Sequence, residues 1–204
     1  MTMHSKRSLF RISLIAAFTV GALCAYNAGA AIAANSNALA QAAPVQNGSH
    51  DFDFLFGTWL VHNRRLEKLP SGEYKWEQFD ATDKYWPLAG GLGNEDVFRT
   101  DHFKKGFVGM TIRLYDATTG TWKLYWINNL NSHGDAGAPN VGKFHGNVGI
   151  FDERLIYHGK PAIDRYIWTN PGKGAKGRPH FEESISQDGG KTWKVLYTAD
   201  LIRT

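Results

Sequence analysis

Cysteine is almost absent from this sequence of 204 residues. Cys24 is the only one, and it lies within the first forty residues. Beyond that point the chain can form no disulfide, use no thiol nucleophile and bind no metal through thiolates. Catalytic motifs are missing as well, because there is no Gly-x-Ser-x-Gly elbow and the histidines show no tight spacing typical of metal ligands. We expect no metal site, and the sequence assigns no catalytic residue.

The first forty residues have the features of an export signal. Lys6, Arg7 and Arg11 precede an apolar run over 12–23 that is too short for a comfortable membrane span. We therefore expect residues 1–40 to be a signal peptide with its cleavage region, and the protein to be periplasmic or secreted. Three small-residue cleavage sites follow the apolar run, and they end at Ala30, Ala33 and Ala40.

Two kinds of partner are not expected. Leu23 precedes Cys24 where a lipoprotein site needs a small residue, so we expect no stable membrane anchor. Removal of the signal also lowers the formal net charge from +4 to +1, because that segment holds three basic residues and no acidic ones. The nearest approach to a basic patch, Lys173, Lys176 and Arg178 among glycines, is typical of a solvated loop. We expect no nucleic-acid partner.

The remaining chain is long enough for one domain with a sizeable core. Cleavage after Ala40 would leave 164 residues, which contain all seven tryptophans. Residues 41–49 show no apolar period and predict a disordered tether. Residues 50–204 are predicted to be a single domain. Within it, residues 51–56 predict a short helical turn that is capped by an Asp and places aromatic rings under the first strand.

Beyond Gly57 the pattern is that of an all-β protein. Aromatic and β-branched runs alternate with turns rich in Gly, Pro, Asn and Asp, and no apolar pattern of helical period is sustained. The connections are short, which predicts an antiparallel up-and-down meander. About ten strands are expected, at 57–68, 73–86, 92–101, 106–116, 121–129, 140–146, 148–157, 161–169, 179–187 and 192–203.

A meander of this length needs a way to protect its edge strands. Closure into a barrel removes the edges altogether, so we expect a closed barrel, with a two-sheet sandwich as the competing architecture. The segment 186–193, Ser-Gln-Asp-Gly-Gly-Lys-Thr-Trp, predicts a hairpin in which Asp188 bonds the turn backbone. It resembles the Asp-box of sialidase propellers, but it occurs once here, and the turn-stabilising interpretation is favoured. The glycine run 90–93 lacks the Lys-Ser/Thr of a phosphate loop and indicates a bulge or barrel corner.

One pairing resembles the lipocalins and the wider calycin group. Gly57-Thr58-Trp59 opens the first strand, and Arg203 closes the last. In that group the tryptophan packs at the closed end of the barrel and an arginine from the final strand lies across its ring, a cation–π contact. The resemblance therefore implies a calycin-like barrel that is closed at one end.

The resemblance extends to an uncharacterised bacterial family of calycin-like barrels, which is known only as a domain of unknown function. That family implies a fold and no function, so no catalytic residue is carried over from it. The segments that carry it are 52–59, 90–94, 113–116, Trp122 with Tyr125 and Trp126, and 188–193.

Side-chain alternation selects candidate ligand-binding residues. If Trp59 points inward, then Asn63 and Arg65 also do, and they approach the open end. Arg113 and Glu182 lie in polar same-face sets that either orient a ligand, form a structural ion pair or face solvent. The candidate ligand-binding residues are Trp59, Asn63, Arg65, Asn94, Arg113, Tyr125, Trp126 and Glu182.

Three functions remain open at this point. The first is an exported barrel that binds a small apolar or aromatic ligand, because barrels of this size can hold one small molecule. The second is an enzyme, such as an isomerase, cyclase or hydrolase, for which Asp96, Glu182 and Glu183 are available as acids or bases. The third is a structural or interaction module with a filled core. No cofactor is expected, and haem would need His145, His158 or His180 as an inward axial ligand.

Overall fold

The structure is a computed structural model, and it describes residues 47–132, 134–172 and 177–204. The predicted signal peptide, with Cys24, lies outside the described residues, as do Lys173 and Lys176. Three short 3₁₀ helices are η1 (Gly48–His50), η2 (Asp53–Leu55) and η3 (Ala89–Gly91). In the described part of the chain, no helix is long and apolar enough to cross a membrane.

Ten strands make up the rest of the fold, and their bounds agree with the predicted ones to within two residues. They are β1 (Gly57–Lys68), β2 (Tyr74–Pro87), β3 (Gly93–Thr100), β4 (Phe107–Asp116), β5 (Thr121–Asn128), β6 (Asn140–His145), β7 (Val148–Tyr157), β8 (Lys160–Thr169), β9 (His180–Ser186) and β10 (Lys194–Arg203).

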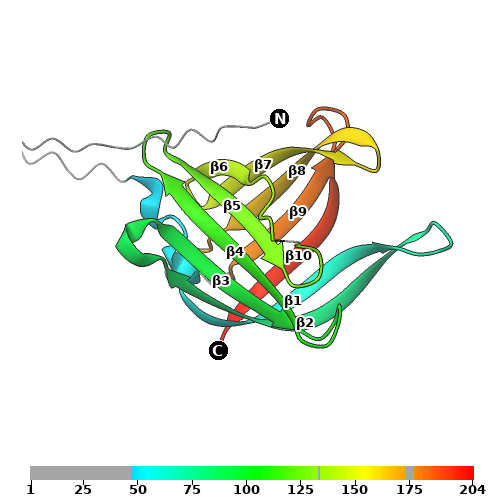
Figure 1. The fold of residues 1–204 in the computed structure, drawn as a ribbon, viewed down its shortest axis with the longest axis horizontal. Helices are drawn as coiled ribbons and strands as arrows, with labels where there is room; N and C mark the ends of the chain where they lie inside the picture. Colours follow the sequence, from blue (N-terminus) through cyan, green and yellow to red (C-terminus); the bar gives the residue numbers. More distant parts are fainter. Residues whose placement is uncertain (1–46, 133, 173–176) are drawn as a thin grey trace, which may run out of the picture. The chain divides into compact units, whose positions relative to one another are not determined.

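The strands form a closed barrel (Figure 1). Each strand pairs antiparallel with the next one in the sequence, and β1 pairs with β10 to complete the circle. The predicted all-β, up-and-down barrel is therefore confirmed, and the sandwich is not formed. Closure pairs every strand on both sides over at least part of its length, which shortens the free edges along which a second sheet could add.

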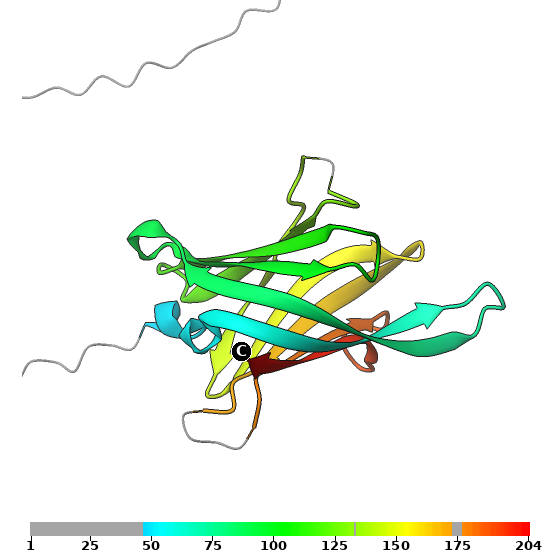
Figure 2. The same cartoon turned by 90° about the horizontal axis from the view of Figure 1, so that it is seen from below.

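The N-terminal helical segment closes one end of the barrel. In both ribbon views it lies at the end where β1 begins (Figures 1 and 2). The Phe52 side chain is fully buried there, with ring centroids 5.0 Å from those of both Trp122 and Phe144. Gly48, inside the predicted tether, is already part of this packing, since its carbonyl accepts a 2.9 Å hydrogen bond from Trp122 Nε1. The aromatic rings below β1 lie as expected.

The predicted aspartate cap differs in detail. Phe52 occupies the N-cap position of η2, and no side chain caps that helix. The burial of the Phe52 ring decides the position of the turn, because a fully buried aromatic side chain outweighs one capping hydrogen bond.

The expected contact between Trp59 and Arg203 is present at this closed end. Trp59 is 5% exposed, and the Arg203 guanidinium carbon lies 4.3 Å from the centre of its ring. The Trp59 indole donates a 2.6 Å hydrogen bond to the Leu55 carbonyl, and Arg203 Nη1 donates one of 2.9 Å to the Phe56 carbonyl. The pair therefore ties the first strand, the last strand and the closing segment together.

The predicted hairpin between β9 and β10 is stabilised as expected. Asp188 Oδ1 accepts backbone hydrogen bonds from Lys191 and Thr192, both 3.0 Å long. Asp188 Oδ2 also accepts from the Thr192 hydroxyl at 2.6 Å. These hydrogen bonds, that of the Thr192 hydroxyl first, lower the pKa of Asp188, because they favour its ionised form. The Asp188 side chain therefore stabilises the turn.

Replacing Trp59 by Ala is expected to destabilise the domain by about 3 to 5 kcal/mol, because a large buried side chain leaves a cavity. Arg203→Ala should cost less, roughly 1 kcal/mol, since that side chain is exposed to solvent. Urea denaturation followed by tryptophan fluorescence would measure both. Trp126→Ala is the control, because Trp126 is 38% exposed, and a Trp59→Ala loss no larger than this control would contradict the role of the closed-end pair.

Candidate functional site

The barrel encloses a cavity of about 760 Å³. Protein interiors seldom leave voids larger than a water molecule, and a volume of roughly 300 to 1,000 Å³ is typical of sites for small ligands. The cavity reaches the connections that follow β3 and β5, where His102, Phe103, Leu130 and Asn131 line it. Its mouth is therefore at the end opposite the helical segment. The interior of the barrel is hollow.

Aromatic rings form much of the cavity wall. They come from seven strands and one connection, and polar side chains lie between them. This mixture fits a pocket that excludes water from a ligand and orients it by a few hydrogen bonds. The aromatic lining residues are Tyr85, Phe98, Phe103, Phe107, Trp126, Tyr166, Trp168, Phe181 and Tyr197.

The structure brings four of the eight candidate residues to the cavity. They are Asn63, Arg65, Arg113 and Trp126. The other four lie elsewhere. Trp59 is packed under Arg203, and Asn94 is buried beneath Arg113. Tyr125 and Glu182 are opposite in strand parity to their lining neighbours, so they face outward.

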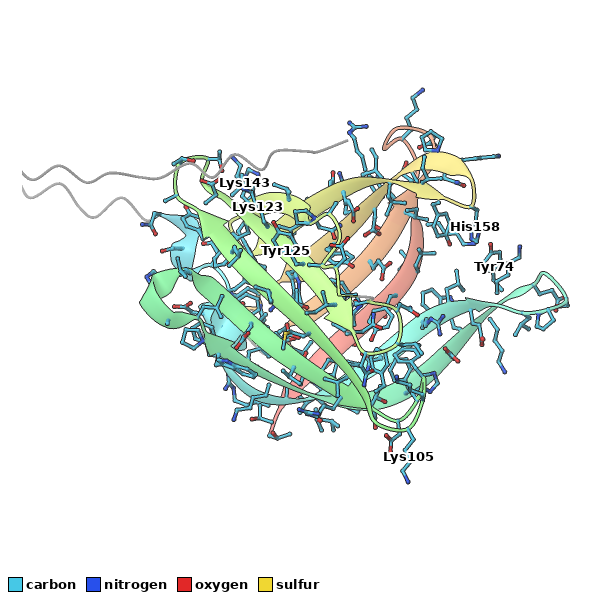
Figure 3. The ribbon with its side chains drawn as sticks, viewed as in Figure 1. Tyr74, Lys105, Lys123, Tyr125, Lys143 and His158 are labelled. Atoms are coloured by element: carbon cyan, nitrogen blue, oxygen red, sulfur yellow. The ribbon has the colours of Figure 1, made fainter. Side chains whose placement is uncertain are left out.

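Strand parity explains the positions of Tyr125 and Glu182. On β5 the lining residues are Leu124, Trp126 and Asn128, which leaves Tyr125 on the outer side with Lys123 (Figure 3). On β9 the lining residues are Phe181 and Glu183, which leaves Glu182 outside. The apolar alternation of Phe181 and Ile185 was the signal in the sequence that places Glu183, and not Glu182, on the inner face.

Trp126 owes its position to a glycine on the neighbouring strand. A Cβ atom added to Gly109 would lie 2.1 Å from the indole ring of Trp126. Gly109 precedes the lining residue Thr111 by two positions on β4, so it shares the inner face. The missing side chain makes room for the tryptophan ring near the mouth of the cavity.

A buried ion pair lies deep in the cavity. Arg113 is 1% exposed, and its Nη2 lies 2.6 Å from Asp96 Oδ1. Its Nη1 also donates a 3.3 Å hydrogen bond to Asn94 Oδ1. The guanidinium carbon is 5.2 Å from the ring centres of both Phe52 and Tyr85. The aromatic rings and the two acceptors together hold the cation in a dry environment.

Asp83 adds a second buried carboxyl near this ion pair. Its Oδ1 has no hydrogen-bond partner among the described residues, and neither does Arg113 Nε. Burial, and next the negative charge of Asp96, raise the pKa of Asp83 well above its ordinary value. Burial also raises the pKa of Asp96, against the opposing effect of Arg113. One cation is therefore surrounded by more carboxyl groups than it can neutralise.

A second polar group lies halfway up the wall. Glu183 pairs in register with Tyr166 on β8 and with Tyr197 on β10, and all three line the cavity. Burial, and next the charge of Asp164, raise the pKa of Glu183 to about 8, which Arg65 opposes. Among the described residues, no hydrogen bond or ion pair reaches the Glu183 carboxyl group. It is a desolvated acid that faces open space.

A β-bulge aligns this second group. The pairing of β9 and β10 shifts register between Val195 and Tyr197, so that Tyr197 lies opposite Glu183. The Tyr197 hydroxyl donates a 2.5 Å hydrogen bond to Asn63 Oδ1. Asn63 in turn donates to the Val61 carbonyl at 3.0 Å, which holds its amide in place. The tyrosine and the asparagine are thus positioned before any ligand binds.

Histidines take little part in the cavity. His102 is the only described histidine that lines it; its ring stacks on Phe79 at 4.0 Å, and its Nε2 is 3.2 Å from Glu77 Oε1. The three histidines considered for haem, His145, His158 and His180, are not among the lining residues. His158 lies at the turn between β7 and β8 (Figure 3), and His180 contacts Asp200 on the outer face. No group of three described metal-ligating side chains is placed to hold a metal ion.

Replacing Arg113 by Met is expected to destabilise the protein by about 3 to 5 kcal/mol, because Asp96 is then left buried without its cation. The double variant Arg113→Met, Asp96→Asn should recover most of this loss. Chemical denaturation would measure both. Arg165→Met is the matched control, since Arg165 makes two 2.7 Å hydrogen bonds to Asp152 near the surface, and it should cost about 1 kcal/mol. Equal losses in the two single variants would contradict the buried pair.

Glu183 should make the stability depend on pH. Because its folded-state pKa of about 8 exceeds the ordinary 4.5, the folded protein binds more protons between these values. The free energy of unfolding therefore falls as the pH rises from 4.5 to 8, by up to about 1.4 kcal/mol per pH unit. Glu183→Gln should flatten this fall, whereas the outward-facing Glu182→Gln should leave it unchanged. Denaturation curves at several pH values would show whether the two variants differ.

No protein-family model matches this chain, and no curated protein matches it significantly. The function is therefore argued from the cavity itself: a hollow, aromatic-lined barrel with one buried ion pair and one unpartnered acid.

Proposed function

We propose that this protein is an exported, calycin-like barrel that binds a small, largely apolar or aromatic molecule. The main support is the cavity of about 760 Å³. An aromatic-lined space of this size lacks the packing contacts of an ordinary protein interior, and a bound ligand would supply them. The contact between Trp59 and Arg203 supports the resemblance to the calycin group. Export is supported by the signal pattern of the first forty residues.

The polar groups of the cavity would give the site its selectivity. Arg113 and Asp83 retain unpartnered polar atoms deep in the cavity, and Glu183 offers a carboxyl group halfway up the wall. A ligand with no polar group would leave all of these unpaired, at a cost for each. The site therefore favours a molecule with an apolar body and at least one group that can hydrogen-bond.

A second candidate function is an enzyme that works in the same cavity. The specific observation in its favour is Glu183, whose pKa of about 8 allows the carboxyl group to take up or release a proton near neutral pH. Tyr166 lies opposite it on β8 and could donate a hydrogen bond to a reacting oxygen. The third possibility, a module with a filled core, lacks support because the interior is hollow.

A panel of lipids, small aromatics and tetrapyrroles tests the proposal. At least one class is expected to quench tryptophan fluorescence and raise the melting temperature, since Trp126 and Trp168 line the cavity. Ala199→Phe, which places a ring in the cavity, should abolish both effects. Thr198→Phe adds the same ring to the next residue, which faces outward, and should preserve them.

The same panel separates the two candidate functions. A ligand recovered unchanged after incubation supports binding, whereas one recovered as a different compound, with Glu183→Gln inactive, supports the enzyme. If no class changes either signal in the wild-type protein, the proposed binding function is wrong.

A further inference from the structure

The charges around the cavity are unbalanced toward the acidic side. Its described lining residues include five carboxyl groups and only two guanidinium groups. One guanidinium, Arg113, is paired with Asp96, and the other, Arg65, lies 3.3 Å from Glu77 Oε1. Glu183 is left without a cationic partner among the described residues. An anionic ligand would meet repulsion here, and a cationic one would meet attraction.

Aromatic rings surround the free acid. Phe181 precedes Glu183 by two positions on the inner face of β9, and its ring centroid lies 5.1 Å from that of Tyr166 and 6.1 Å from that of Tyr197. The Trp168 ring is 5.0 Å from Phe181 on the side of the closed end. Four rings therefore cluster beside one unpartnered carboxylate. Aromatic rings around a carboxylate are the chemistry that binds an organic ammonium group.

A neutral ligand satisfies this site less well. A carbonyl group could accept a hydrogen bond from protonated Glu183, but it would add no charge to offset the surplus of carboxylates. An ammonium group would neutralise Glu183 and lie beside the rings of Tyr166 and Tyr197 at the same time. Both interactions strengthen where the ligand displaces water from the cavity.

We propose that the ligand of this cavity carries an organic ammonium group, and that Glu183 is its counter-ion within the rings of Tyr166, Phe181 and Tyr197. The inference rests on the proposed binding function and narrows it to amines and quaternary ammonium compounds with an apolar body. The Arg113–Asp96 pair lies nearer the closed end. It stabilises the fold there and does not bind the ammonium group.

Binding of such a cation is linked to the loss of a proton. Below its pKa of about 8, Glu183 is protonated in the empty cavity, and it must release that proton to the solvent when the cation binds. The other titratable or charged groups that face it are Asp164 and Tyr166 on β8, Tyr197 on β10 and Arg65 on β1. Burial raises the pKa values of both tyrosines, so they stay neutral. Asp164, with its pKa raised to about 6, adds attraction above that pH.

The test compares two probes of the same shape. Benzyltrimethylammonium carries a permanent charge, and neopentylbenzene replaces its nitrogen by carbon. Isothermal titration calorimetry on the wild-type protein is expected to show at least tenfold tighter binding of the cation at pH 8. Affinity for the cation should rise by up to tenfold per unit between pH 6 and 8 and level off above that. Calorimetry in buffers of different ionisation enthalpy should show close to one proton released per cation at pH 6.5.

Two glutamine variants locate the effect. Glu183→Gln should remove the preference for the cation and the proton release while it keeps binding of neopentylbenzene, which also shows that the variant is folded. Glu182→Gln, on the outer face of the same strand, should behave as the wild type.

Each other outcome has a distinct meaning. Equal binding of the two probes by the wild-type protein overturns the ammonium inference and leaves the proposed binding function standing. A cation preference that persists in Glu183→Gln also overturns it, because another carboxylate is then the counter-ion. Binding of neither probe overturns the inference, and the broader panel then decides separately whether the cavity binds any ligand.

Discussion

The pairing of β1 with β10 is the interaction on which the rest of this structure depends. It brings Trp59 opposite Arg203, two residues at opposite ends of the domain, and so turns a meander of hairpins into a closed wall. Closure creates an interior that solvent reaches only from one end, because η1 and η2 cover the other. An open sheet would expose the same polar side chains to water, and the pKa shifts that burial causes would disappear.

The polar groups of that interior lie in two places, and its low dielectric gives them different properties in each. Near the closed end, Arg113 and Asp96 neutralise each other, and aromatic rings shield the pair. Farther toward the mouth, Glu183 has only a distant cation, so burial dominates and the pKa of its carboxyl group rises. Near the closed end Arg113 has an ionic partner within the protein, although Arg113 Nε and Asp83 Oδ1 have none among the described residues. No described cation forms an ion pair with Glu183.

Candidate site residues were predictable where alternation along one strand was enough. Asn63 and Arg65 follow Trp59 in steps of two on β1, and both line the cavity. The choice between Glu182 and Glu183 depended on the apolar alternation of Phe181 and Ile185 on the same strand, because adjacent residues face opposite sides. Tyr197 could not be placed from sequence at all, since a bulge after Val195 shifts the alternation of β10. A one-residue shift exchanges the inner and outer faces, so a site built from several strands is sensitive to each register.

The sequence by itself determined the all-β class, the number and bounds of the strands and the turn built on Asp188. These features follow from local forces: the two-residue alternation of apolar side chains, the conformational freedom of glycine and the hydrogen bonds of an aspartate to its own turn. Only the tertiary structure decided that the interior is hollow and that Glu183 faces it beside Tyr166 and Tyr197. The size of a cavity and the partners of a buried charge depend on residues far apart in the chain, which meet only when the barrel closes.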